Sequence, residues 1–246
     1  GSNEAIPSST VVSYTFQEPT DLPYTCNFDE EGDNGWLLKN GSCINKWYIG
    51  TPADSTNGKL YISDSNGTSA SYSTNSVSVV VAEKLFQLGA TDSIRISFDL
   101  TFRGESVFDY LKVYWVPADT VYEASDNEDV YYGKSTYANG VIMNNCSDPY
   151  YTFVNLVTGT QNMSVTLLNN PNELRKLVFV WKNDGGVGSQ PPAIIDNIMI
   201  EEVGEEITCF KPIDNSLTAT NLTSTSATIS WQISDESQFA WNVYYK

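Results

Sequence analysis

One acidic residue in an apolar run is the feature of this sequence that most directly suggests chemistry. Asp196 alternates with Ile194, Ile198 and Ile200, so a β-strand would place all four side chains on one face. An unpaired carboxylate on a buried face is costly in free energy. Either coordination of a calcium ion or hydrogen bonds from backbone amides near the end of the sheet would satisfy it.

Calcium is the metal that the composition favours. The chain holds 30 acidic residues and no histidine, and calcium binds carboxylate and carbonyl oxygens. Asp64 and Asn66, in the turn after Ile62, could supply further oxygens to an ion at Asp196. The spacing of the acidic residues does not match an EF-hand loop. A calcium site and a fully hydrogen-bonded Asp196 therefore both remain open.

Asp99 and Asp109 form a second acidic pair. Asp99 would lie on the polar face of a strand whose other face carries Phe98 and Leu100. Two carboxylates that face each other across a groove could hydrolyse a glycosidic bond. Solvated carboxylates without a catalytic role are the alternative, and a β-rich binding domain favours it.

Aromatic residues near the middle of the chain are candidates for ligand binding. Residues 118–160 are rich in tyrosine and aspartate and match no motif that we can assign. Loops usually carry recognition in sandwich domains, so the rings in and beside this section could form an exposed patch. Rings that fold back onto the domain are the alternative. The rings concerned are Trp115, Tyr131, Tyr132, Tyr150 and Tyr151.

The absence of histidine and the strong negative charge exclude several functions. Without histidine there is no Ser-His-Asp or Cys-His catalytic arrangement and no histidine-ligated zinc or iron. With 30 acidic against 13 basic residues, the formal net charge is −17, which repels nucleic-acid phosphates and anionic membranes. No apolar run is long enough to cross a bilayer. We expect no enzymatic activity, no nucleic-acid binding and no membrane insertion.

The four cysteines do not form a metal-binding or redox motif. They are Cys26, Cys43, Cys146 and Cys209, and none belongs to a Cys-x-x-Cys pair. A disulfide between Cys26 and Cys43 would close the shortest loop and is the pairing that we favour. Free buried cysteines are the alternative, because a domain of this size does not need a disulfide.

Alternation of apolar and polar residues predicts that β-strands position all of these groups. The alternation runs through residues 93–103 and recurs around residues 77–81, 111–115 and 163–167. Residues 177–181 are apolar on both faces, which is typical of a central strand. Clusters of Gly and Asn separate the runs, and helix signals are nearly absent. The sequence therefore predicts an all-β fold with the strands in a sandwich or barrel.

A short acidic stretch divides the chain into a large and a small β-domain. Residues 201–206 contain four glutamates and one glycine, and the spacing of apolar residues changes after them. The expected segments are a tag remnant and linker at 1–13, a first domain at 14–203, a linker at 204–208 and a second domain at 209–246.

The last segment resembles the opening of a fibronectin type III domain. The resemblance is carried by Cys209, Pro212, Leu217 and the runs 226–231 and 241–245. In that family a tryptophan on the second strand and a tyrosine on the third anchor the core. Here Trp231 corresponds to the first and Tyr244 or Tyr245 to the second. The residues present account for about three of the seven strands of such a fold, so we expect a partial immunoglobulin-like sandwich.

The first domain is similar to the jelly-roll domains of the cleaved-adhesin and choice-of-anchor J group of Bacteroidetes surface proteins, and more distantly to MAM domains. The resemblance implies an antiparallel jelly-roll sandwich on an exported surface protein, with Trp36, Trp47 and Trp181 in its core. It rests on an ordered set of short motifs at residues 26–29, 35–36, 47–50, 96–99, 109–114, 177–184 and 191–198.

The same resemblance implies a structural calcium ion, which in related jelly rolls often joins the first strand to the last. On this chain the partner of Asp196 from the first strand would be Asp29, with Glu30 or Glu31 beside it. The predicted ligands are therefore Asp29, Glu30, Asp64, Asn66 and Asp196.

The function that we expect is non-catalytic binding outside the cell. The module would act as a surface adhesin that recognises a host glycan, glycoprotein or matrix protein, with calcium bracing the sheets. One alternative is an accessory, carbohydrate-binding-like domain of a larger secreted peptidase or glycoside hydrolase. Another is an architectural spacer. The expected location is extracellular or on the outer cell surface.

Overall fold

The structure is a computed structural model, and it describes residues 17–105, 108–127, 159–168, 171–206, 212–213 and 215–233. The chain divides into two compact units, Gly1–Gly204 and Glu205–Lys246. Strands are the only regular secondary structure in the described ranges, which confirms the all-β prediction. In those ranges there is accordingly no helix that could span a membrane.

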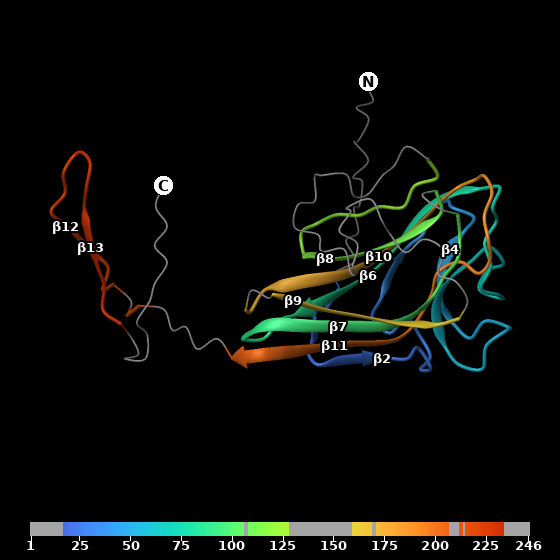
Figure 1. The fold of residues 1–246 in the computed structure, drawn as a ribbon, viewed down its shortest axis with the longest axis horizontal. Coiled ribbons are helices and arrows are strands. Elements are labelled where there is room, and N and C mark those ends of the chain that lie inside the picture. Colours follow the sequence, from blue (N-terminus) through green and yellow to red (C-terminus); the bar gives the residue numbers. More distant parts are fainter. Residues whose placement is uncertain are drawn as a thin grey trace, which may run out of the picture. The chain divides into compact units, whose positions relative to one another are not determined.

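The first sheet of the larger unit has β10 at its centre (Figure 1). β10 (Leu174–Asp184) pairs antiparallel with β6 (Val77–Gln87) along its whole length and with β8 (Tyr110–Pro117) on its other side. The short strands β1 (Thr20–Asp21) and β3 (Leu37–Lys39) pair with β6, the former in parallel. Residues 177–181 thus form a central strand, as predicted.

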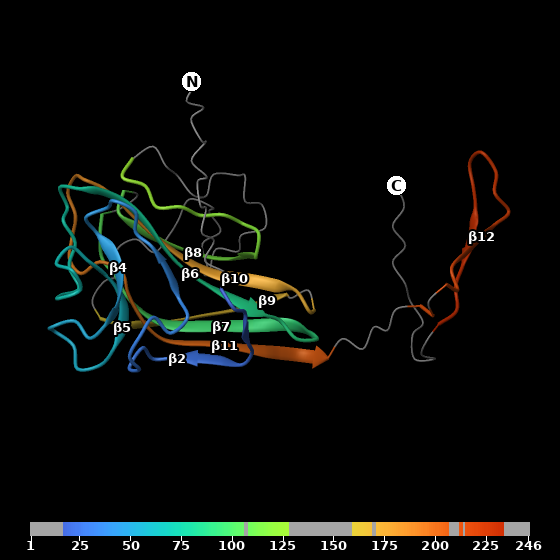
Figure 2. The same cartoon turned by 180° about the vertical axis from the view of Figure 1, so that it is seen from behind.

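The second sheet places β11 between β2 and β7 (Figure 2). β11 pairs antiparallel with β5 through Ile194 and Ile195, and with β2 through Ile198 to Ile200. The strand order is β4, β5, β11, β7 and β9. β2 also pairs with β11, farther along that strand than β5 does. The strands are β2 (Tyr24–Cys26), β4 (Lys46–Gly50), β5 (Lys59–Ser63), β7 (Thr91–Thr101), β9 (Gln161–Leu168) and β11 (Ile194–Glu206).

The main core lies between the two sheets. Ile96, Phe98 and Leu100 of β7 are fully buried and alternate with more exposed polar residues, as the period of two predicts. Phe98 meets Phe179 of the other sheet edge to face, with ring centroids 5.3 Å apart. Burying each such side chain contributes roughly 1.5–3 kcal/mol. Because one face of each strand packs in the core, only the opposite face is left for other interactions.

A second apolar cluster covers the outer side of the five-stranded sheet. Val178 and Val180 of β10 belong to it, whereas their neighbours Leu177, Phe179 and Trp181 face the main core. The cluster comprises Val79, Val81, Tyr114, Val116, Tyr122, Val178 and Val180.

Two valines of β6 lie on this outer cluster rather than in the main core. The alternation at residues 77–81 predicts one dry face and one wet face, but Val79 and Val81 are buried in the second cluster while Val80 and Ala82 face the main core. The backbone of Ser125 pairs with Val79, and Tyr122 of the same segment packs in this outer cluster. Alternation cannot identify the core face when both faces are buried.

The cysteines that the structure describes are not bonded to each other. Cys26 is half-buried, Cys43 is buried, and both thiols are free. The Sγ of Cys43 lies 3.3 Å from the carbonyl oxygen of Ser125 and 3.7 Å from that of Val79. The favoured Cys26–Cys43 disulfide is therefore wrong, and the alternative of free thiols is correct for these two residues. Cys146 and Cys209 lie outside the described residues.

The smaller unit contains an exposed hairpin. β12 (Thr218–Thr220) pairs antiparallel with β13 (Thr228–Ser230), and the backbone N of Thr223 donates to the carbonyl of Ser226 at 2.8 Å in the connecting turn. These strands fall where the sequence places the first two strands of the second domain. The run 241–245 lies outside the described residues, and the fibronectin type III assignment stays a prediction.

Candidate functional site

An extra residue in β11 reverses the expected direction of its side chains. Asn197 has a φ of 49°, and the core residues on either side of it, Ile195 and Ile198, are three positions apart instead of two. A left-handed residue in a strand is typical of a β-bulge, which shifts the alternation by one. The prediction that Asp196 shares the core face of Ile198 is therefore wrong. Asp196 and the exposed Asn197 lie on the outer side of the sheet.

Asp196 is satisfied by protein groups. Its Oδ2 contacts the ammonium of Lys59 and accepts a hydrogen bond from Nδ2 of Asn57 at 3.2 Å. Its Oδ1 accepts from the backbone N of Asn197 at 2.7 Å. Only 6% of Asp196 is exposed, so this carboxylate needs these partners. A lysine ammonium stands where the sequence suggested a metal ion.

The same segment joins the beginning of the chain to its last long strand. The backbone N of Gly58 donates to Oδ1 of Asp29 at 2.8 Å, while its neighbours Asn57 and Lys59 bind Asp196. The resemblance predicted that an ion would make this link. In the structure residues 57–59 make it.

The other predicted calcium ligands have separate partners. Asp64 accepts a hydrogen bond from the hydroxyl of Ser71 at 2.6 Å, and Asn66 accepts one from Tyr48 at 3.3 Å. Calcium binding by the predicted set stays a prediction. Among the described residues, no three of its acids bring carboxylate oxygens within 4.8 Å of one another, these acids being Asp29, Glu30, Asp64 and Asp196.

Hydrogen-bonding side chains from neighbouring strands form a row across the outer face of the six-stranded sheet. Asp99 of β7 accepts from Nδ2 of Asn162, its partner on β9, at 3.0 Å. Its other oxygen accepts from Nδ2 of Asn197 on β11 at 2.8 Å. Next to Asn197, Asp196 continues the row to Lys59 on β5. We call these five side chains the polar row.

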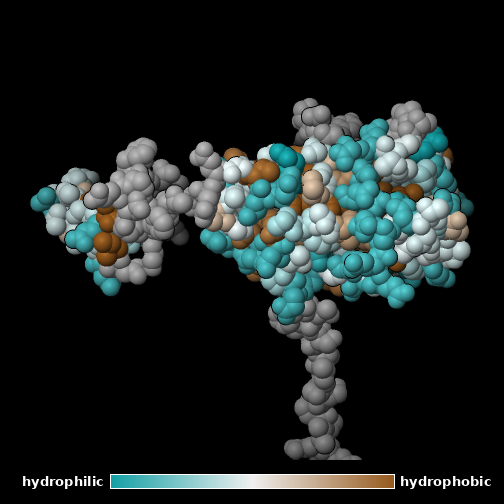
Figure 3. Space-filling model, turned by 90° about the horizontal axis from the view of Figure 1, so that it is seen from below, coloured by the Kyte–Doolittle hydropathy of each residue, from teal (hydrophilic) through white to brown (hydrophobic). Residues whose placement is uncertain are grey.

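A hollow of about 290 Å³ opens over four of the five side chains of the polar row, all except Asn162. The hollow is polar, and no aromatic side chain belongs to its described lining. The surface of the larger unit seen in Figure 3 is likewise largely hydrophilic. The lining residues are Asn57, Lys59, Asp99, Thr101, Thr160, Ile194, Asp196 and Asn197.

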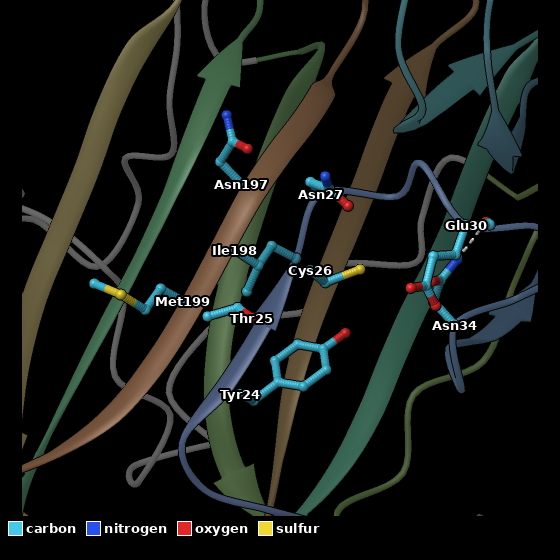
Figure 4. Close-up of a pocket in the computed structure, with 9 residues that line it drawn as sticks. All are labelled: Tyr24, Thr25, Cys26, Asn27, Glu30, Asn34, Asn197, Ile198 and Met199. Carbon is cyan, nitrogen blue, oxygen red and sulfur yellow. Dashed lines mark hydrogen bonds between the residues drawn. The ribbon is translucent and has the colours of Figure 1, made fainter.

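A larger hollow of about 700 Å³ surrounds β2, and Tyr24 is the aromatic residue in its described lining. Figure 4 shows Tyr24 and Cys26 extending from one side of β2 and Asn197 and Met199 lying on the other. The Tyr24 ring has the Lys84 ammonium 5.1 Å from its centroid, and burial raises the pKa of its hydroxyl. The smaller hollow brings together three charged side chains, Lys59, Asp99 and Asp196, whereas Glu30 is the charged residue in the described lining of the larger one, and the smaller hollow is therefore our candidate for specific recognition.

A separate acidic group lies where three strand ends meet. Oxygens of Glu105, Asp109 and Asp184 lie within 4.8 Å of one another, which is close enough for all three to ligate one cation. Asp109 is 1% exposed, and its Oδ2 accepts from the hydroxyl of Tyr72 at 2.6 Å. Burial raises the pKa of Asp109 to about 6, and the adjacent carboxylates raise it while the hydrogen bonds oppose them.

Asp109 differs from its prediction in two ways. The sequence favoured a solvated carboxylate, but the residue is buried. It also belongs to a different site from Asp99, whose oxygens bind the amides of the polar row. Strand register could have revealed the acidic group, because Lys182 pairs with Tyr110 and thereby brings Asp109 beside the end of β10.

The predictions for the aromatic residues have different outcomes. Trp36, Trp47 and Trp181 are buried in the main core, as the resemblance implies. Trp115 is also buried there, with its ring centroid 5.8 Å from that of Phe86, so its assignment to an exposed patch is wrong. Trp115 lies two positions after Val113 on β8, and both side chains face the main core. Tyr131, Tyr132, Tyr150 and Tyr151 lie outside the described residues.

No family model matches the chain, and no curated protein matches it either. Among solved structures it is similar to the enzymatically active domain of tailspike protein 4 of bacteriophage CBA120, at 10% identity and a TM-score of 0.38, over 72% of this chain and 20% of that one.

Two further similarities are to carbohydrate-binding modules. TmCBM61 in complex with β-1,4-galactotriose is 10% identical with a TM-score of 0.35, over 68% of this chain and 88% of that one. A family 35 module from Clostridium thermocellum is 9% identical with a TM-score of 0.34, over 74% and 98%. At such scores these similarities do not indicate what this chain binds.

Proposed function

We propose that this chain is a non-catalytic module that binds glycans through the polar row. The observation that carries the proposal is the set of carboxylate, amide and ammonium groups that three adjacent strands, β5, β11 and β7, direct into one hollow. Sugar hydroxyls both donate and accept hydrogen bonds, and planar carboxylates and amides can each engage two of them.

The hydrogen bonds within the row favour binding because they hold the side chains in place. Asp99 is fixed between Asn162 and Asn197, and Asp196 between Asn57 and Lys59. Side chains that are already ordered lose little rotamer entropy when a ligand arrives.

The affinity should nevertheless be low. No described aromatic ring lines the hollow, so stacking would contribute nothing there. Hydrogen bonds contribute about 1 kcal/mol each in net terms, and about four of them correspond to a Kd near 1 mM.

The carboxylates of the row are not arranged as an acid and a base. A glycosidase needs one carboxyl group that keeps its proton. Asp196 contacts an ammonium, and Asp99 accepts two amide hydrogen bonds, so both carboxylates act as hydrogen-bond acceptors within the row. This supports binding rather than hydrolysis.

The cellular role that we propose is adhesion by a protein displayed outside the cell. The resemblance of residues 14–203 to cleaved-adhesin domains supports this role. Service as an accessory domain of a larger secreted enzyme is the second candidate, and it would use the same polar row.

A structural calcium ion is a second element of the proposal. Glu105, Asp109 and Asp184 offer the hard oxygen ligands that calcium prefers, from segments next to β7, β8 and β10. One oxygen of Asp109 accepts from Tyr72 and the other from the backbone N of Asp184, at 3.3 Å, and each retains a lone pair. An ion there would hold three strand ends together.

Affinity electrophoresis tests glycan binding directly. The protein is run through gels that contain one soluble polysaccharide each, namely galactan, mannan, xylan or hydroxyethylcellulose. We expect retardation by at least one of them and its loss in Asp99→Ala. Asp119→Ala is the matched control, because Asp119 is an exposed aspartate that follows β8 on the other sheet. Retardation by none of the four, or equal retardation of Asp99→Ala, contradicts the proposal.

A further inference from the structure

The charge and hydrogen-bonding capacity of the polar row indicate a chemical class of ligand. We infer that the row selects uncharged, hydroxyl-rich glycans and rejects glycans that carry carboxylate or sulfate groups. This inference rests on the proposed function and adds to it the chemistry of the ligand.

The first support is the charge around the hollow. Among the residues that the structure describes, its lining contains two carboxylates, Asp99 and Asp196, and a single cation, Lys59. Because Lys59 already contacts Asp196, it is committed to that carboxylate. Drawing Lys59 toward an anionic ligand would leave the nearly buried Asp196 without its cation, which is costly. An anionic sugar would therefore meet Asp99 with no free cation in the lining to compensate.

The second support is the hydrogen-bonding capacity that is left over. Each oxygen of Asp99 accepts one amide hydrogen, from Asn162 or from Asn197, and each retains a further lone pair. The amide oxygens of those asparagines are also acceptors. Asn162 and Asn197 each keep one amide hydrogen and Lys59 keeps ammonium hydrogens, but the acceptor lone pairs outnumber these donors, so the row favours a ligand that brings donors. Hydroxyl groups do so, whereas carboxylates and sulfates bring only acceptors.

The third support is the extent of the row. Its members come from β9, β7, β11 and β5, which are consecutive in the sheet. Three spacings of about 4.8 Å between neighbouring strands make a row roughly 14 Å long. A chain of several sugars that lies across the strands could contact the whole row, whereas a monosaccharide could reach only part of it. Affinity should therefore rise with chain length.

Matched polymers that differ only in charge test this inference. We propose affinity electrophoresis with dextran against dextran sulfate, and with hydroxyethylcellulose against carboxymethylcellulose, together with the galactan, mannan and xylan gels. The runs are done in low salt and in 0.5 M NaCl, where about 4 Å of Debye screening removes long-range repulsion by the −17 charge. We expect retardation by at least one uncharged polymer and by neither anionic one at both salt concentrations.

Two variants with equal charge separate local selection from the overall charge. Asp99→Asn and Asp119→Asn each remove one negative charge, but only the first alters the row. We expect Asp99→Asn to lower affinity for the uncharged polymer about tenfold, as loss of a charged acceptor should. The difference between its affinities for the uncharged polymer and for the matched anionic polymer should become smaller. Asp119→Asn should behave like the unaltered protein.

The outcomes are distinguishable. Equal or tighter binding of an anionic polymer overturns the inference and leaves glycan binding intact. Binding of uncharged polymers that Asp99→Asn does not weaken shows that the row is not the site, and overturns the inference. Binding of no polymer, charged or uncharged, contradicts the proposed function itself.

Discussion

The outer face of the six-stranded sheet carries charged and amide side chains bound to one another, whereas the outer face of the five-stranded sheet carries valines and tyrosines under a loop. On the first, Asp99 and Asn197 meet at a hollow. On the second, Val178, Val180 and Tyr122 are fully or almost fully buried. Both faces belong to one sandwich with one core. The comparison shows that the covering of a sheet decides which face can recognise a ligand.

The covering of the five-stranded sheet is fixed by polar contacts as well as by apolar ones. The Nζ of Lys39 donates to the carbonyl of Tyr122 at 2.9 Å, and the Nζ of Lys176 donates to that of Thr120 at 2.5 Å. Glu83 lies between the two lysines, 3.2 Å from Lys39 and 3.5 Å from Lys176. Nothing comparable lies over the polar row in the described part of the chain.

A charge placed on each face should give the largest difference between them. Val178→Asp would bury a carboxylate directly opposite Glu83 and Tyr114, neither of which is a cation, and we expect a loss of more than about 4 kcal/mol in unfolding free energy, or no folded protein. Thr166→Asp, on the exposed side of β9, should change the unfolding free energy by less than about 0.5 kcal/mol. Urea denaturation followed by circular dichroism measures both. Similar losses of unfolding free energy in the two variants would refute the predicted difference between the two faces.

The titration of a lysine buried on the covered face should make the unfolding free energy depend on pH. Burial, with a smaller contribution from the Lys182 ammonium, lowers the pKa of Lys112 from 10.5 to about 8. Between these two pKa values the unfolded chain binds more protons than the folded one, so stability rises with pH. Below about pH 8 both states are charged and the penalty is complete.

We expect a gain of at most roughly 3 kcal/mol in unfolding free energy between pH 8 and 10. Lys112→Met should remove most of this slope and raise stability at pH 7. Denaturation curves at a series of pH values provide the measurement. A slope that is unchanged in the variant would show that other groups cause it.

Breaking the Lys59–Asp196 pair should have an intermediate effect. Asp196→Ala leaves a largely buried ammonium without its partner and should cost about 2 kcal/mol in unfolding free energy. The double variant Lys59→Met, Asp196→Leu should recover most of that loss, because two apolar side chains need no partner. The loss should be the same with and without EDTA. A loss that EDTA abolishes would instead support calcium at Asp196.

Calcium at the acidic group should have the smallest effect. Calcium at ten times its Kd would add about 1.4 kcal/mol to the unfolding free energy. For a unit of this size that raises the melting temperature by roughly 3–6 °C. Differential scanning fluorimetry with calcium or EDTA measures the shift, and Asp184→Asn should reduce it. Asp64→Asn is the control, since Asp64 binds elsewhere. An equal reduction in both variants would place the ion outside this group.

Some predictions succeeded because they concern local patterns. The alternation around Phe98 and the continuous apolar run from Leu177 to Trp181 each report how one strand meets its surroundings. Such patterns need no knowledge of which strands are neighbours. The alternation in β11 failed at Asn197 because one left-handed residue shifts every later side chain. The presence of an asparagine in the sequence does not by itself predict a left-handed backbone conformation.

By itself the sequence determined that the described ranges form strands, that the alternation in β7 gives one buried and one exposed face, and that the chain lacks imidazole chemistry. Only the tertiary structure decided that Lys59 satisfies Asp196 across 137 positions and that Asp99 joins Asn162 and Asn197 in one row. It also decided that Glu105, Asp109 and Asp184 meet. The physical reason is that burial of one face gives the sequence of a strand an alternation of apolar and polar residues. The neighbours of a polar side chain depend instead on the order of the strands in the sheet, which cannot be read from the sequence of one strand.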